Sequence, residues 1–172
     1  MSGCIGAVVA EHHPVTSSAA DGDALRPVLR LSAVELRPLP GAVPSARLHT
    51  RLVVCEWGFP AIATDAELIV SELVTNAVVH GSVTAGAAAG QPPIRLRLSG
   101  RARGVFVDVW DCGEEMPRLR ADPLSEEPGG RGLLLVAALA SRWGACRTEG
   151  GGKRVWAALV TPGARPLQGP PG

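Results

Sequence analysis

Apolar and polar positions in the first part of the chain predict a strand followed by a helix. The stretch VLRLSAVELRPL, residues 28–39, alternates loosely between apolar and polar residues and stops at Pro38, as a strand does. Apolar residues then recur at roughly helical intervals between Val43 and Trp57, and Gly58 follows as the expected C-cap. We therefore expect one strand and one amphipathic helix here.

A second helix is predicted from Thr64 to about His80. Thr64 is followed three residues later by Glu67, a capping-box pattern in which each side chain satisfies a free backbone N–H at the start of a helix. The periodic pattern ends at Gly81.

The remaining patterns predict two strand pairs separated by a long loop and a third helix. Residues 94–99 and 105–111 alternate cleanly around a glycine-bounded turn, which predicts a hairpin. Residues 112–128 show no periodicity, and structureless segments of this length are usually functional or disordered. Residues 130–144 predict a helix opened by glycines, and residues 145–160 predict two short strands joined by a glycine turn.

This order of elements lacks regular β-α-β alternation, which indicates an α+β fold. We expect a two-layer sandwich in which the helices cover one face of a mostly antiparallel mixed sheet. Residues 28–160 form the domain, whereas 1–27 and 161–172, rich in small residues or in Pro and Gly, are expected to be flexible tails.

Composition narrows the classes of partner. The 172 residues carry 17 basic and 16 acidic side chains, so no overall field attracts nucleic acid or an anionic membrane. No stretch approaches the roughly 18 apolar residues that a membrane span needs, and we expect a cytoplasmic protein. The four cysteines are scattered without metal-ligand spacing, so we expect free thiols. They are Cys4, Cys55, Cys112 and Cys146.

The second predicted helix carries a row of polar side chains. Glu72, Asn76 and His80 are four residues apart, so they lie about 40° apart around the helix axis and form one inclined row. Such a row can face a functional site. A solvent-exposed polar stripe is the alternative reading of this spacing.

A carboxylate and a glycine follow the apolar strand that ends near residue 111. Asp111 could accept a hydrogen bond from an exocyclic amino group, and Gly113, two residues later, would allow a ligand to approach the backbone closely. An ordinary β-turn is the alternative, because Asp and Gly are common turn residues.

Glycines open the third predicted helix. Gly129, Gly130 and Gly132 lie at its start, where free backbone N–H groups and the helix dipole favour a phosphate. Arg131 could add a positive charge. A flexible hinge is the alternative, and the segment lacks the pattern of a P-loop.

Together and in this order, the three motifs resemble those of GHKL ATP-binding domains, the family that includes gyrase, histidine kinases and heat-shock chaperones. The similarity lies in the N-box (72–80), the G1 box (111–113) and the G2 box (130–135), and it covers residues 36 to 160. The stretches DAELIVSELVTNAVVHG, GGRGLLLVAALASRWG and GKRVWAAL are similar to those of bacterial anti-sigma-factor serine kinases and of actinobacterial single-domain relatives.

The resemblance implies a site for ATP and Mg²⁺. In such a site Asn76 would hold Mg²⁺, Glu72 would act as general base, and residues 112–130 would form a lid over the phosphates. The implied nucleotide-binding residues are Asn76, Asp111, Gly113, Gly130, Arg131, Gly132 and Leu133.

The implied function is that of an anti-sigma-factor-like serine kinase, which binds a sigma factor and phosphorylates an anti-anti-sigma protein. The alternative is a non-catalytic ATP-binding module that presents a protein surface. Glu114 and Glu115 support it, because they stand where the family usually has a second glycine. Lys153 stands where the family often has threonine or serine, and it could meet a phosphate or simply cover the surface.

A surface on the first helix could pair with a partner or a second copy. Arg47, Arg51 and Val54 would contribute to it. We expect neither nucleic acid nor a membrane as partner.

Overall fold

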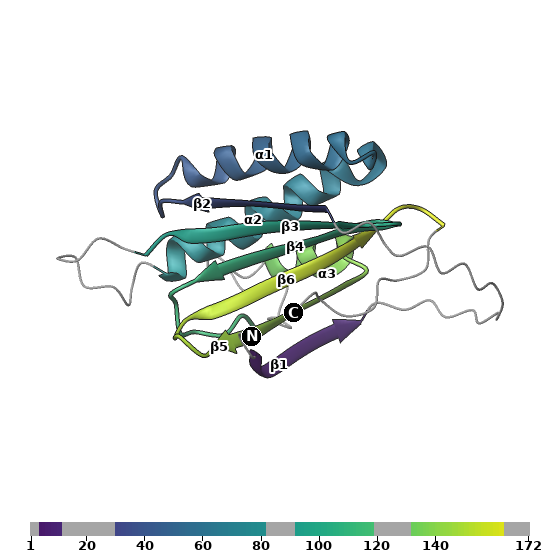
Figure 1. Ribbon diagram of the computed structural model, residues 1–172. Helices are drawn as coiled ribbons and strands as arrows, with labels where there is room; N and C mark the ends of the chain where they lie inside the picture. Colours follow the sequence, from purple (N-terminus) through teal and green to yellow (C-terminus); the bar gives the residue numbers. More distant parts are fainter. Residues whose placement is uncertain (1–3, 12–29, 82–91, 119–131, 164–172) are drawn as a thin grey trace.

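The computed structural model describes residues 4–11, 30–81, 92–118 and 132–163. The elements in chain order are β1 (Cys4–Glu11), β2 (Arg30–Leu36), α1 (Ala42–Glu56), the 3₁₀ turn η1 (Pro60–Ile62), α2 (Ala63–Gly81), β3 (Ile94–Arg101), β4 (Gly104–Asp111), α3 (Gly132–Leu139), β5 (Arg142–Thr148) and β6 (Lys153–Val160). The strands form a sheet in the order β1-β5-β6-β4-β3-β2 (Figure 1).

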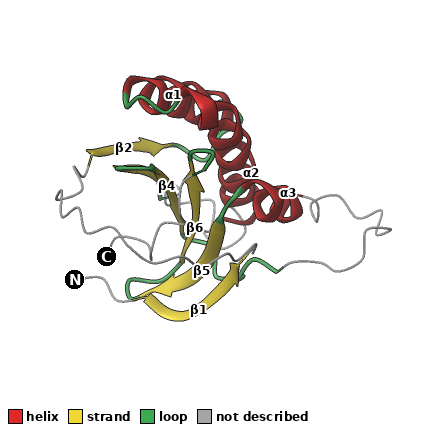
Figure 2. Ribbon diagram, turned by 90° about the vertical axis from the view of Figure 1, so that its right-hand side faces the viewer, coloured by secondary structure: helices red, strands yellow, loops and turns green. Residues whose placement is uncertain are grey.

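The predicted α+β sandwich is confirmed, with α1, α2 and α3 on one face of the sheet (Figure 2). Every described pair of neighbouring strands is antiparallel, so the sheet is not mixed. Strand β4 shows how the two faces differ: Val105, Val107 and Val109 join the core, whereas Phe106 and Asp108 lie on the other face. This alternation follows from the two-residue period of a strand.

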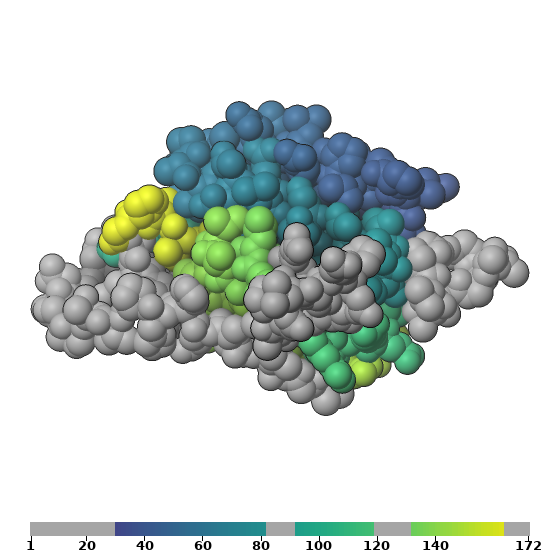
Figure 3. Space-filling view, turned by 180° about the vertical axis from the view of Figure 1, so that it is seen from behind, coloured from purple at the N-terminus to yellow at the C-terminus, as the bar shows by residue number. Residues whose placement is uncertain are grey.

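Helix α2 lies at the centre of the helical layer. Its apolar residues are buried between the sheet and the other helices, as the sequence pattern predicted; they are Ile69, Val70, Leu73, Val74 and Ala77. Seen from the helical side, α1 and α2 lie above α3 (Figure 3). The helix that carries the polar row is therefore fixed by packing along much of its length.

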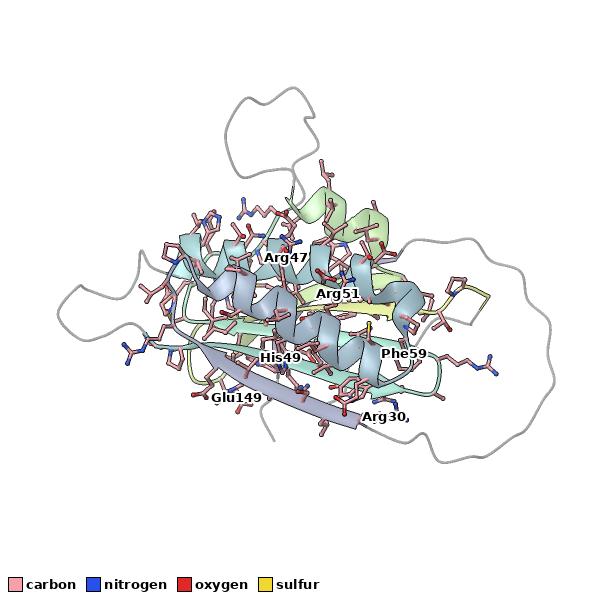
Figure 4. The ribbon with its side chains drawn as sticks, turned by 90° about the horizontal axis from the view of Figure 1, so that it is seen from above. Arg30, Arg47, His49, Arg51, Phe59 and Glu149 are labelled. Atoms are coloured by element: carbon pink, nitrogen blue, oxygen red, sulfur yellow. The ribbon has the colours of Figure 1, made fainter. Side chains whose placement is uncertain are left out.

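The arginines of the surface predicted on α1 form ion pairs within the chain. Arg51 donates a hydrogen bond to Glu67 of α2 over 3.0 Å, and Arg47 lies 3.9 Å from the same carboxylate. Figure 4 shows both arginines on the side of α1 that faces α2. Val54 is fully buried. Val54 therefore cannot contribute to such a surface, whereas Arg47 and Arg51, with side chains 51% and 62% exposed, pair with Glu67 and still reach the surface.

Two predicted helix boundaries differ from the structure. Helix α2 starts at Ala63, directly after the 3₁₀ turn that Pro60 opens, so Thr64 lies inside the helix and is not its N-cap. Helix α3 ends at Leu139 and not near Gly144, because the residues from Arg142 onward pair with β6 as strand β5.

The N-terminal part of the chain also differs from its prediction. Strand β1 lies within the segment expected to be a tail and pairs with β5. Cys146 of β5 is disulfide-bonded, so the expectation of free thiols was wrong for this residue; Cys55 and Cys112 are free. None of the described helices is long and apolar enough to cross a membrane.

Candidate functional site

Glu72 and the start of α3 are in direct contact. A Cβ added to Gly132, the first residue of α3, would overlap with Oε2 of Glu72 and lie 3.2 Å from its Cδ. Only a residue without a side chain fits here in the observed arrangement. The structure thus brings together the proposed catalytic carboxylate and the helix start at which we expect a phosphate.

Asp111 and Gly113 form a tight turn where β4 ends. The N–H of Gly113 donates to Oδ1 of Asp111 over 2.7 Å, so the turn that was the alternative reading is present. A Cβ on Gly113 would lie 2.8 Å from that same oxygen and 3.0 Å from the carbonyl oxygen of His80. The turn is therefore closely packed against the last residues of α2.

Lys153 completes this end of the site. Its ammonium lies 2.7 Å from Oδ1 of Asp111 and donates to the carbonyl oxygen of Gly113 over 3.3 Å. Lys153 is only 4% exposed and Asp111 only 9%. The hydrogen bonds that Asp111 accepts from Gly113 and Lys153 both reach Oδ1, and no described residue donates to Oδ2 in these contacts.

Burial raises the pKa of Asp111 above its ordinary value of 3.8. The hydrogen bond and the charge of Lys153, the N–H of Gly113 and the charge of His80 act in the opposite direction. Lys153 therefore helps to keep a buried carboxylate in its ionised form, in which both oxygens accept hydrogen bonds.

Helix α2 connects the two parts of the site. Gly81, its last residue, lies against Asp111, since a Cβ there would be 3.7 Å from that of Asp111. Glu72 is nine residues earlier, which corresponds to about 13 Å along the axis. This distance is comparable to that between the base and the terminal phosphate of an extended nucleoside triphosphate.

Asn76 lies between these two ends. It is half-buried, and its side chain makes no hydrogen bond with another described residue. Its amide oxygen is the hard type of ligand that Mg²⁺ requires, and Mg²⁺ in nucleotide sites is commonly held by only one or two protein oxygens together with phosphates and waters. The described residues contain no group of three or more His, Cys, Asp or Glu that could hold a metal alone. Asn76 thus fits a magnesium ion that arrives with a nucleotide.

The two acidic residues after the turn are exposed. Glu114 and Glu115 both point toward solvent, and Oε2 of Glu115 lies 4.0 Å from Nδ1 of His80. His80 therefore contacts the start of the predicted lid. Exposed charges are screened by water and salt, so these acids repel a bound phosphate less than buried ones would.

The remaining predicted residues stand as follows. Leu133 is buried in the core, so only its backbone could bind a ligand. Gly130 and Arg131, with most of the predicted lid, lie outside the described residues.

The contact of Lys153 with Asp111 was not predicted. A sequence signal existed, because Lys153 is the only lysine in the chain and follows three glycines next to an apolar strand.

Comparison with known families identifies the class of the domain. A family model described as a histidine kinase-like ATPase domain matches residues 36–159. The matched range begins at the end of β2 and ends in β6, so it includes all the site residues discussed above. No curated protein matches the sequence significantly.

Proposed function

Because the chain belongs to the family of histidine kinase-like ATPase domains of the GHKL type, an ATP-binding family, we propose that it is an anti-sigma-factor-like serine kinase. Its substrate would be a serine of an anti-anti-sigma protein. The observation that supports phosphoryl transfer most directly is the contact between Glu72 and the start of α3, which puts a possible base beside a phosphate-binding helix end.

The chemistry needs one proton acceptor and one place for the phosphates. The serine oxygen attacks the terminal phosphorus of ATP, the bond from that phosphorus to the bridging oxygen breaks, and ADP leaves. Glu72 takes the proton of the serine hydroxyl. Asp111 accepts a hydrogen bond from the adenine amino group, and the N–H groups at the start of α3 bind phosphate oxygens. Mg²⁺, held by Asn76, would neutralise phosphate charge.

The test is phosphorylation of a candidate anti-anti-sigma protein in the presence of Mg-ATP. We expect phosphoserine with the wild-type chain, and a loss of at least about a hundredfold in rate for Glu72→Gln with ATP affinity retained, since a general base contributes typically 10²–10⁴-fold. Asn76→Ala should weaken Mg-ATP binding itself. Absence of phosphoserine at high protein concentration, with ATP bound, would refute the kinase.

A second candidate is a non-catalytic regulator that binds ATP in order to present a protein surface. The replacement of the second G1 glycine by Glu114 and Glu115 favours it. In that case Glu72→Gln would leave both ATP binding and the cellular phenotype unchanged. A lost phenotype with intact binding would exclude this alternative.

A cytoplasmic partner is part of the proposal. Leu48 and Leu52 are one helical turn apart on α1, and each is 60% exposed. Exposed apolar side chains of this kind suit a protein surface, so a sigma factor, the anti-anti-sigma protein or a second copy would bind there. Leu48→Asp with Leu52→Asp should abolish partner or self-association, measured by light scattering, while ATP affinity stays the same.

A further inference from the structure

Lys153 and Asp111 place a hydrogen-bond donor and an acceptor side by side at the proposed base-binding end of the site. An ammonium carries three N–H donors. Two of them are used by Oδ1 of Asp111 at 2.7 Å and the carbonyl oxygen of Gly113 at 3.3 Å. Neither contact involves Oδ2 of Asp111. The third donor of Lys153 and this oxygen are therefore not used by these contacts.

The ammonium of Lys153 and the carboxylate of Asp111 together decide which class of base can bind at this end of the site. At position 6 adenine presents an amino donor, whereas guanine and hypoxanthine present a carbonyl acceptor. A carboxylate alone accepts the amino group and repels the carbonyl. A carboxylate beside an ammonium can bind either group. The carboxylate accepts from the amino group of adenine, and the ammonium donates to the carbonyl of guanine or hypoxanthine, since Lys is a common donor to the guanine O6.

From this juxtaposition we infer that Lys153 contacts the base and widens the nucleotide specificity of the site to 6-oxopurines such as GTP and ITP. The inference rests on the proposed nucleotide binding and adds the class of base to it. The positive charge of Lys153 also lowers the repulsion between the buried carboxylate of Asp111 and an electron-rich carbonyl oxygen of the base.

A phosphate-binding role for Lys153 does not fit its position. The ammonium is held at Asp111, which lies beside Gly81 at the C-terminal end of α2. The start of α3 contacts Glu72, nine residues back along that helix and so about 13 Å away. Lys153 is thus at the opposite end of the site from the helix start that suits phosphates.

The experiment is titration calorimetry of the full chain with Mg-ATP, Mg-GTP and Mg-ITP. For the wild type we expect dissociation constants for ATP and GTP within about tenfold of each other. Lys153→Met should raise the ratio of the GTP to the ATP dissociation constant at least about tenfold, the loss expected when one specific base contact is removed. Lys153→Arg should keep the wild-type ratio. Arg95→Met, on an exposed arginine that pairs with Glu35, is the matched control and should change neither constant.

Three results would overturn the inference. These are a wild type that binds ATP but rejects GTP by more than a hundredfold, a Lys153→Met variant that loses both nucleotides equally, and one that keeps the wild-type ratio. In each case the proposed binding of ATP by the wild type is unaffected. If no nucleotide binds to the wild type, the proposed function fails as well. Should Lys153→Met not fold, the ratios for the wild type and Lys153→Arg decide.

Discussion

The carboxylate of Glu72 on α2 occupies the space that a Cβ on Gly132, the first residue of α3, would take. The positive end of the dipole of α3 is thus next to a negative side chain, which is a favourable electrostatic arrangement. The same contact restricts the residue at position 132, because a Cβ would meet the carboxylate.

Gly132→Ala should lower the phosphorylation rate without lowering the stability of the fold. The added Cβ overlaps with the end of a flexible side chain, so Glu72 can rotate away and the fold is kept, while alanine is itself a better helix former than glycine. We expect a melting temperature within a few degrees of wild type and a phosphorylation rate at least about tenfold lower, since misplaced catalytic groups are costly. Gly150→Ala, which meets no atom within 4 Å, should change neither. Full activity in Gly132→Ala would contradict the proposed role of Glu72.

Gly151 and Gly152, in the turn before β6, offer a matched pair for stability. Both have positive φ angles, 85° and 78°, so alanine at either is strained by about 1 kcal/mol or more. At Gly151 the space is open, but at Gly152 the Cβ would overlap with the backbone carbonyl of Asp111. Urea unfolding should show Gly152→Ala as the less stable variant by at least about 1 kcal/mol, and only this variant should also weaken ATP binding. Equal losses of stability in the two variants would argue against the close approach of the turn before β6 to the turn after β4.

ATP affinity should fall in acid because of Asp111. Its folded-state pKa is raised above 3.8 by burial, so the ionised acceptor is fully present above that raised pKa and is lost as the pH falls through it. The charged groups facing it are Lys153 on β6 and His80 on α2. Removing the cation in Lys153→Met raises the pKa of Asp111 further and should move the loss of affinity to higher pH. Calorimetry against pH measures this shift, and Asp111→Asn supplies the baseline without the carboxylate. A wild-type curve identical to that of Asp111→Asn would contradict the role of Asp111.

Asp108, on the face of the sheet away from the helices, should be important for stability. It is fully buried, and it accepts hydrogen bonds from Arg154 over 2.7 Å and from Arg97 over 3.3 Å. Asp108→Ala leaves these guanidinium groups without their shared carboxylate, which should cost about 3 kcal/mol or more.

The control for Asp108 is the exposed pair of Arg95 and Glu35 at 3.4 Å. Glu35→Ala should cost less than about 1 kcal/mol, because exposed ion pairs contribute little. Both variants can be compared by urea unfolding. If Asp108→Ala lowered the free energy of unfolding by less than about 1 kcal/mol, as expected for Glu35→Ala, the buried cluster would not be structurally important.

Strands β2 to β6, the helices and the family could be predicted from the sequence because their signals are local, whereas strand β1 was expected to be part of a tail. Alternation in residues 94–99 and 105–111 and the 3.6-residue period around Leu73 are direct consequences of which face is buried. The order of the motifs identified the family, which the match over residues 36–159 confirms.

Contacts between distant segments could not be predicted in this way. Glu67 had the spacing of a capping residue, but it pairs with Arg51 of another helix. Lys153 reaches Asp111 across 42 positions of the sequence, and their pairing depends on the register of β4 and β6. Residues 142–144 continued the helical pattern, yet strand pairing with β6 decided their conformation.

Helix α2 also fixes the spacing between the two ends of the proposed nucleotide site. Because Glu72 and Gly81 belong to one continuous helix, the interval between the start of α3 and Asp111 is set by a fixed number of helical residues and does not adjust to a shorter molecule. A nucleoside diphosphate anchored by its base would leave the far end empty. In the proposed site, loss of the terminal phosphate would therefore remove the ligand from the start of α3, next to Glu72.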